Sequence, residues 1–170
     1  MSARGTRAID VLRRAGVAHA VREYEPGPPG SARRVGAATR PAYGEEAAAA
    51  LGVEPGRVFK TLVVAVDGRL VLAIVAVAAE LDLKRLADAL GGRRALLADP
   101  AEAERATGYV VGGISPLGGR RTLPVVLDVA AMSQATVFVS AGRRGLQVEL
   151  APGDLARLST ATLAPIARPR

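Results

Sequence analysis

The chain has 170 residues, of which 49% are hydrophobic, so it is long enough to bury the core of one domain and too apolar to be intrinsically disordered. It contains no cysteine and a single histidine, His19, which excludes disulfides, thiolate metal sites, a cysteine nucleophile, a zinc cluster and an obvious Ser/His/Asp set. The net charge of +7 favours a polyanionic partner such as RNA or DNA, but a general preference for arginine explains it equally well, because all but two of the 23 basic residues are arginine.

The first part of the chain alternates between helical and extended patterns. Residues 6–15 have the period of an amphipathic helix, and residues 18–25 alternate as a strand does. Residues 25–44 are rich in Pro, Gly and Arg and have little periodicity, which predicts a long loop. A short helix is expected over residues 45–51, where alanines dominate.

The strongest local signal is a β-hairpin. Two apolar runs, residues 58–66 and 69–77, flank Asp67-Gly68, a pair that suits a two-residue turn. Because both runs are almost continuously apolar, we expect these strands to be buried on both faces. A helix with an aspartate as its N-cap is then expected over residues 83–90.

The second part of the chain mixes short elements around a glycine-rich loop. This loop, TGYVVGGISPLGG, spans residues 107–119 and has no charge. A strand over 94–98 and a helix over 101–107, with Asp99 as its N-cap and Pro100 at its first position, are expected before it. After the loop we expect strands over 124–129, 136–142 and 145–150, a helix near 153–159 and an apolar tail.

These elements predict a single α+β domain over residues 1–170. Helices and strands do not alternate strictly, so we expect a mixed β-sheet, curled toward a barrel, with helices packed around it. The N-terminus lacks the apolar segment of a secretory signal, and the longest apolar run, residues 70–79, is too short to cross a bilayer. We therefore expect a cytoplasmic protein without a membrane partner.

Lys60 is a candidate functional residue because lysine is so rare in this chain. Where arginine is the usual cation, a lysine is typical of a site that needs a compact ammonium group. The stretch GRVFKT, residues 56–61, lacks the spacing of a nucleotide phosphate loop and leads into a strand. Two interpretations remain: Lys60 lies on the exposed face of an edge strand, or it points into a partly buried pocket toward a phosphate or carbonyl oxygen.

The glycine loop and the last hairpin supply the other candidates. The amides of Gly112 and Gly113 can approach a carbonyl oxygen, because no β-carbon stands in the way, although a plain connection between a helix and a strand is equally compatible. Ser140 ends a strand, and Arg143-Arg144 follow it in a turn. That arginine pair suits a solvated hairpin tip better than a contact with an RNA backbone.

Several of these stretches together resemble a known family. FKTL, TGYVVGGISPLG and VFVSAGRRGLQVEL, in this order, resemble the YbaK group of the prolyl-tRNA editing-domain family over about residues 8–160. The resemblance implies an aminoacyl-tRNA deacylase without a cofactor or metal, and its best-known members are free-standing Cys-tRNA(Pro) deacylases. It also implies tRNA(Pro) as substrate, recruitment to prolyl-tRNA synthetase, no DNA partner, and a monomer or small homo-oligomer.

The resemblance also implies a site. Lys60 and Thr61 match the family's Lys-Thr pair, with Lys60 holding the terminal adenosine or the ester, and Gly112 and Gly113 match the glycine pair whose backbone faces the aminoacyl carbonyl. The substrate's own thiol would attack the carbonyl, which suits a chain without Cys or a His cluster. Pocket residues are implied at Tyr24, Tyr43, Ser140 and Gln147.

Two features depart from that family pattern. Gln147 stands where the deacylases carry an aspartate, so the negative charge is lost, and the loop over residues 25–44 is longer than usual. Both leave open whether cysteine or alanine is the amino acid removed. A third possibility is a module with the same fold that binds tRNA or a synthetase without catalysis.

Overall fold

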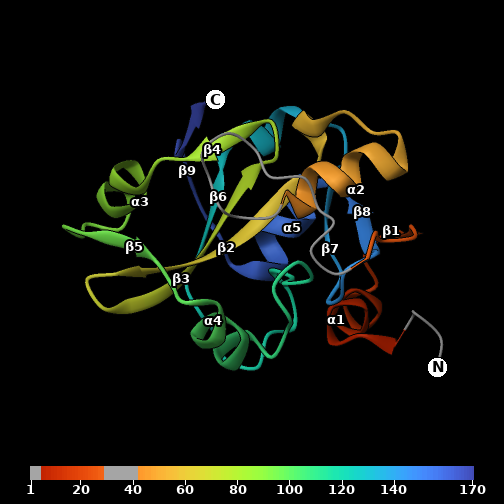
Figure 1. Cartoon of the computed structure of the whole chain (residues 1–170), viewed down its shortest axis with the longest axis horizontal. Helices are drawn as coiled ribbons and strands as arrows, with labels where there is room; N and C mark the ends of the chain where they lie inside the picture. The colour runs from red at the N-terminus through yellow and green to blue at the C-terminus, as the bar shows by residue number, and fades with distance from the viewer. Residues whose placement is uncertain (1–4, 29–41) are drawn as a thin grey trace.

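The computed structural model describes residues 5–28 and 42–170, and they form an α+β fold with mixed sheets (Figure 1). The helices are α1 (Arg7–Ala15), α2 (Tyr43–Leu51), α3 (Leu83–Ala89), α4 (Pro100–Thr107) and α5 (Pro152–Ser159), with 3-10 turns η2 (Pro55–Arg57) and η3 (Val129–Ser133). The strands are β1 (His19–Glu23), β2 (Phe59–Val66), β3 (Arg69–Ala76), β4 (Ala79–Leu81), β5 (Ala95–Leu97), β6 (Val125–Asp128), β7 (Val137–Ser140), β8 (Leu146–Leu150), β9 (Thr162–Ala164) and β10 (Ala167–Pro169).

The strands form three sheets. The largest has the order β5-β2-β3-β6-β9 and is mixed, since β2 pairs antiparallel with β3 and β5 whereas β3, β6 and β9 run parallel. A second sheet has the antiparallel order β1-β8-β7, and β4 pairs with β10 in a third. In Figure 1 the β2–β3 hairpin crosses the middle of the molecule, with β5 and α3 toward one end and β1, β7 and β8 toward the other.

The prediction of a curled, barrel-like sheet is wrong, because the described strands form separate open sheets that do not close around an axis. The two larger sheets are joined by one isolated bridge between Val58 and Phe138. The two sheets do not pair at residues before Val58, because the 3-10 turn η2 immediately precedes it and interrupts the extended backbone.

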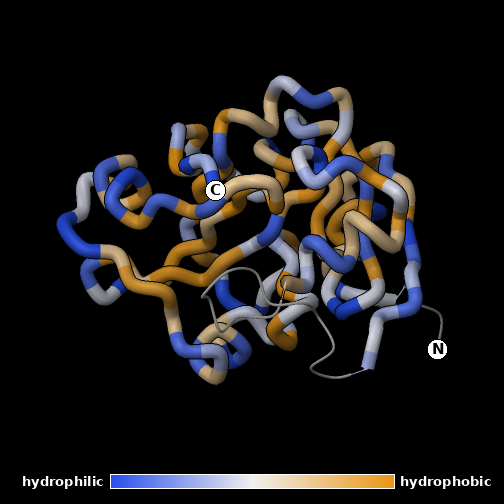
Figure 2. Tube along the Cα trace, turned by 45° about the horizontal axis from the view of Figure 1, so that its top comes forward, coloured by the Kyte–Doolittle hydropathy of each residue, from blue (hydrophilic) through white to orange (hydrophobic). Residues whose placement is uncertain are grey.

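The central hairpin is confirmed as predicted. Asp67 and Gly68 both have positive φ angles, 49° and 81°, which is the backbone of the tight turn that joins twisted strands. The Asp67 carboxylate accepts hydrogen bonds from the amides of Arg93 and Arg94 and thereby ties the turn to the start of β5. Seven of the eight residues of β3 are buried, and Figure 2 shows hydrophobic residues along most of both strands.

Two helices cover the three-stranded sheet, one on each face. α1 begins at Thr6, whose hydroxyl accepts a hydrogen bond from the Ile9 amide, and its buried side chains join the main core with the β8 residues Leu146 and Val148. α2 packs on the opposite face, where its residue Ala48 forms a separate cluster with Val58, Val77 and Phe138. α2 therefore stands between the ends of the two larger sheets, and this position brings its first turn to the candidate site.

Some predicted boundaries differ from the structure. α2 begins at Tyr43, two residues before the predicted start, and residues 29–41 of the predicted loop lie outside the described part of the chain. Asp99 takes the N-cap position of α4 as predicted, but its side chain makes no capping hydrogen bond. The three-residue strands β4, β9 and β10 were not anticipated from the sequence.

None of the described helices combines the length and the apolar character needed to cross a membrane.

Candidate functional site

Lys60 lies near the start of β2 in a partly buried position. Its Nζ donates a hydrogen bond to the carbonyl of Ala79 at 3.3 Å, and burial lowers the pKa of its ammonium group. The charge of Arg170 lowers this pKa further, whereas Glu45 and Glu80 act in the opposite direction. The structure thus excludes an exposed side chain for Lys60 and places its cation close to the first turn of α2.

Thr61 follows Lys60 but points to the other face of the sheet, because successive side chains of a strand alternate. Phe59 and Val63, which share the orientation of Thr61, belong to the main core, whereas Val64 on the face of Lys60 belongs to a second cluster. The hydroxyl of Thr61 is buried and has no hydrogen-bond partner among the described residues. Lys60 and Thr61 are therefore neighbours in sequence whose side chains lie on opposite faces of the sheet, although both are partly buried.

Ser140 and Gln147 are brought together by the register of β7 and β8, in which they are directly opposed. Directly opposed residues of antiparallel strands share a face, and this face also carries Phe138, which packs against α2. Gln147 is 6% exposed, and its Oε1 and the Oγ of Ser140 are both buried without a partner in the described chain. Two such atoms on opposed residues are uncommon in a folded protein, and a bound ligand or water would give them partners.

Gly112 and Tyr43 are also brought together. Gly112 has a φ of 95°, a conformation that suits glycine, and a β-carbon at this position would lie 3.3 Å from three carbons of the Tyr43 ring. The ring of Tyr43 comes from the first turn of α2, next to Glu45, whose charge acts on Lys60. The first turn of α2 thus lies between the glycine loop and the partly buried Lys60.

Gly113 differs from the expectation for the glycine pair. Its amide donates a hydrogen bond to the carbonyl of Val110 at 2.8 Å, so this N–H closes a turn and does not face a substrate. A β-carbon on Gly113 would lie 2.5 Å from the Cα of Arg143, which shows that the glycine loop rests directly on the β7–β8 turn. The Gly112 amide, in contrast, makes no backbone hydrogen bond within residues 5–28 and 42–170.

Tyr24 follows β1 at the same end of the three-stranded sheet. Its amide donates to the carbonyl of Gly145 in the β7–β8 turn at 3.0 Å. Burial raises the pKa of the Tyr24 hydroxyl, and the charges of Glu46 and Arg144 act on it as well. Tyr24 therefore lies beside the other predicted residues of the β7–β8 end and keeps a neutral hydroxyl at physiological pH.

Glu46 and Arg144 are residues of this region that sequence reasoning missed. The sequence predicted that both arginines of the β7–β8 turn are solvated. Arg143 is exposed, as predicted, but the side chain of Arg144 is only 19% exposed. Arg144 Nη2 lies 2.8 Å from both carboxylate oxygens of Glu46, and its guanidinium lies over the ring of Tyr43. The two partners are 98 residues apart, so no local pattern could have revealed the pair.

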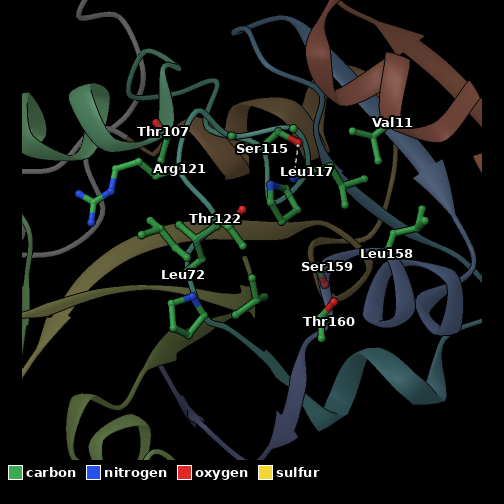
Figure 3. A pocket seen from close by; sticks show the side chains of 16 residues that line it. Val11, Leu72, Thr107, Ser115, Leu117, Arg121, Thr122, Leu158, Ser159 and Thr160 are labelled. Atoms are coloured by element: carbon green, nitrogen blue, oxygen red, sulfur yellow. Dashed lines mark hydrogen bonds between the residues drawn. The ribbon is translucent and has the colours of Figure 1, made fainter. Parts of the chain in front are cut away.

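A cleft of about 570 Å³ lies elsewhere, between the second half of the glycine loop, α1, β3 and the end of α5 (Figure 3). None of the eight predicted site residues lines it. Its buried hydroxyls are satisfied within the protein, since Thr107 donates to the carbonyl of Ala103 and Ser115 accepts from the amide of Leu117. Ser140, Arg144 and Gln147 instead carry buried polar atoms without partners among the described residues, which favours the α2 side of the molecule as the functional site, whereas the unpartnered hydroxyl of Thr61 faces the main core. No group of three or more side chains that could hold a metal ion occurs in the described residues.

Residues 40–158 match the family model described as the aminoacyl-tRNA editing domain. A protein of Enterococcus faecalis, EbsC, named as a candidate Cys-tRNA(Pro)/Cys-tRNA(Cys) deacylase, is 41% identical over 123 residues, which are 72% of this chain and 75% of that protein. The Ser/Thr-tRNA deacylase ProXp-y of Escherichia coli is 35% identical over 113 residues, 64% of this chain and 68% of that protein. A crystal structure described as a candidate trans-editing enzyme for prolyl-tRNA synthetase superposes with a TM-score of 0.80 at 27% identity and covers 99% of both chains.

Proposed function

This chain belongs to the YbaK group of the aminoacyl-tRNA editing-domain family, and we propose that it hydrolyses mischarged tRNA(Pro), with Cys-tRNA(Pro) as its main substrate. The proposal is supported by buried polar side chains that lack partners among the described residues, by a glycine amide that makes no backbone hydrogen bond there, and by a partly buried lysine. Prolyl-tRNA synthetase loads smaller amino acids by mistake, because a proline pocket cannot strongly exclude them. A deacylase that removes them needs a small pocket and a means to stabilise the ester's developing charge.

The Gly112 amide, which makes no backbone hydrogen bond in the described part of the chain, supplies one donor for the ester carbonyl oxygen. A donor that is fixed before the reaction stabilises an oxyanion without reorganisation, and mutation of such a donor in other enzymes costs about a hundredfold to a thousandfold in rate. The ammonium of Lys60 adds a compact positive charge for the terminal adenosine or the ester region. Its present bond to the Ala79 carbonyl is long, at 3.3 Å, and a substrate oxygen can replace it.

The cleavage step itself uses the substrate. The cysteine sulfur forms a bond to its own carbonyl carbon, the bond from that carbon to the 3′-oxygen of the tRNA breaks, and the thiol proton moves to the leaving oxygen. The products are a thiolactone of cysteine and a tRNA with a free 3′-hydroxyl. The protein contributes orientation, which alone provides a large share of such a rate enhancement.

Gln147 and Ser140 support a polar amino acid side chain in the pocket. Their buried oxygens can accept a hydrogen bond from a thiol or hydroxyl group, and Gln147 does so without a negative charge. This observation keeps a hydroxylated amino acid as a second candidate substrate, because the related Escherichia coli protein is named as a Ser/Thr-tRNA deacylase. Ala-tRNA(Pro) is a third candidate, and its ester lacks any side-chain nucleophile.

A different class of function is a module that binds tRNA or prolyl-tRNA synthetase without catalysis, and the neutral Gln147 is the feature that favours it. Such a module would bind tRNA with an affinity that falls as salt rises, yet leave the half-life of every ester unchanged. Recruitment to the synthetase, action as a monomer or small oligomer, and a single domain over residues 1–170 are parts of the main proposal.

The test of the proposed function is deacylation by the purified protein. We expect Cys-tRNA(Pro) to be deacylated and Lys60→Ala to slow the reaction greatly, while Lys84→Ala, which removes the other, exposed lysine, leaves the rate unchanged. If the wild-type protein turned over no mischarged tRNA, the enzymatic proposal would be wrong and the binding module would take its place.

A further inference from the structure

The ion pair between Glu46 and Arg144 joins two parts of the candidate site that are distant in sequence. Glu46 lies in the first turn of α2, and Arg144 lies in the turn between β7 and β8. Both carboxylate oxygens lie 2.8 Å from Arg144 Nη2, and the two side chains are 18% and 19% exposed. A pair this buried is screened little by solvent, so it holds its two elements in a fixed relation.

The same guanidinium also holds the ring of Tyr43. Its Cζ lies 4.9 Å from the ring centroid, which is the distance of a cation–π contact. The ring in turn rests on Gly112, where a β-carbon would be 3.3 Å from three ring carbons. The Tyr43 ring is therefore held by a contact with Arg144 on one side and a contact with Gly112 on the other.

We propose that Arg144, held by Glu46, is a positioning residue that locks the Tyr43 ring against Gly112 and thereby limits the size of the amino acid that the site accepts. The size limit rests on the proposed function, whereas the locked position of the Tyr43 ring rests only on its contacts with Arg144 and Gly112. A fixed aromatic wall excludes the larger cognate amino acid, proline, and admits a smaller one. A loosened wall loses this discrimination.

The experiment compares Arg144→Lys with the matched variant Arg143→Lys at the neighbouring exposed arginine. Lysine keeps the positive charge but lacks the planar guanidinium, which in Arg144 stacks on the ring and offers a fork of donors to the carboxylate. Glu46→Gln serves as a second variant, because it weakens the same pair from the other side. All three substitutions keep the length of the side chain close to that of the wild-type residue.

The first readout needs no tRNA. The chain contains three tyrosines, so protein labelled with 3-fluorotyrosine gives three fluorine NMR signals, and Tyr43→Phe identifies the one from Tyr43. We expect this signal to move in Arg144→Lys and Glu46→Gln and to stay in place in Arg143→Lys. The signal of Tyr109, which stacks under Arg7 instead, reports that the fold is intact.

The second readout is the ratio of kcat/KM for Cys-tRNA(Pro) to that for Pro-tRNA(Pro). We expect it to fall about tenfold in Arg144→Lys, within the range that one pocket contact contributes to discrimination. An unmoved Tyr43 signal in both Arg144→Lys and Glu46→Gln, or a moved signal with an unchanged ratio, would overturn the proposal. If the wild-type protein hydrolysed no ester, the proposed function and the size limit would both fall, whereas a moved Tyr43 signal would still establish the locked ring.

Discussion

Ser140 and Gln147 are directly opposed across β7 and β8, and each keeps a buried side-chain oxygen without a hydrogen-bond partner among the described residues. An unsatisfied buried polar group costs about 1–3 kcal/mol. Nothing in the packing of this face requires polar atoms, since the neighbouring Phe138 belongs to an apolar cluster with α2. The cost is explained if the two oxygens serve a ligand.

Gln147→Met separates function from stability. Methionine keeps the length of the side chain and removes its amide, so we expect the free energy of unfolding to rise by about 1 kcal/mol while deacylation of Cys-tRNA(Pro) falls about tenfold. Urea unfolding and the deacylation rate measure the two effects. Gln134→Met, at a half-buried glutamine that follows η3, is the matched control and should change neither quantity appreciably. A loss of stability in Gln147→Met would show that the amide serves the fold.

Lys60→Met tests the burial of the ammonium through pH. Burial holds the pKa of Lys60 below its ordinary value of 10.5, so between the two values the unfolded chain binds more protons than the folded one. The free energy of unfolding of the wild-type protein should therefore rise as pH rises toward 10.5, and the burial cost is present in full below the folded pKa. We expect Lys60→Met to be more stable than wild type at about pH 7, with a smaller difference at a second pH close to 10.5.

The measurement is urea unfolding of both proteins at the two pH values. Lys84→Met is the control, because Lys84 is exposed in α3, and its difference from wild type should not depend on pH. A Lys60→Met protein whose stability tracked wild type at both pH values would mean that the ammonium is solvated.

Alanine substitutions of three glycines should follow a fixed order. Gly113→Ala should be the most destabilising, because the new β-carbon would lie 2.5 Å from the backbone of Arg143, which cannot yield easily. Gly112→Ala places alanine at a φ of 95° and crowds the Tyr43 ring, and we expect it to cost about 1–3 kcal/mol. Gly56→Ala meets no atom within 4 Å and should stay within about 0.5 kcal/mol of wild type. Thermal or urea unfolding gives the order, and equal effects at all three positions would contradict the described loop.

Local patterns predicted much of this fold. The hairpin around Asp67-Gly68 and the helix over Arg7–Ala15 are confirmed, because turn chemistry and apolar period act over a few residues. The strands β9 and β10 were missed because each has three residues, and each is held by a partner far away in sequence, β6 or β4. The predicted curling of the sheet toward a barrel was wrong for a related reason. Whether a sheet closes depends on which distant strands pair, and local patterns do not determine this.

The roles of the predicted site residues stay predictions, and the structure shows only how these residues are placed. Tyr43 and Gly112 lie together, but Lys60 and Thr61 face opposite ways, because a strand alternates its side chains. The role of Arg144 could not be inferred, since its partner Glu46 is remote in the chain and an arginine pair in a turn is usually solvated. The turn that occupies the Gly113 amide likewise depends on a loop conformation that glycine content alone does not determine.

The most direct test of the account is the half-life of the ester bond of Cys-, Ala- and Pro-tRNA(Pro) with the wild-type protein under one set of conditions. We expect the half-life of Cys-tRNA(Pro) to shorten most, because its thiol attacks its own carbonyl beside the Gly112 amide. Ala-tRNA(Pro) should shorten less and Pro-tRNA(Pro) should not change. Unchanged half-lives for all three esters, or faster loss of alanine than of cysteine, would contradict it.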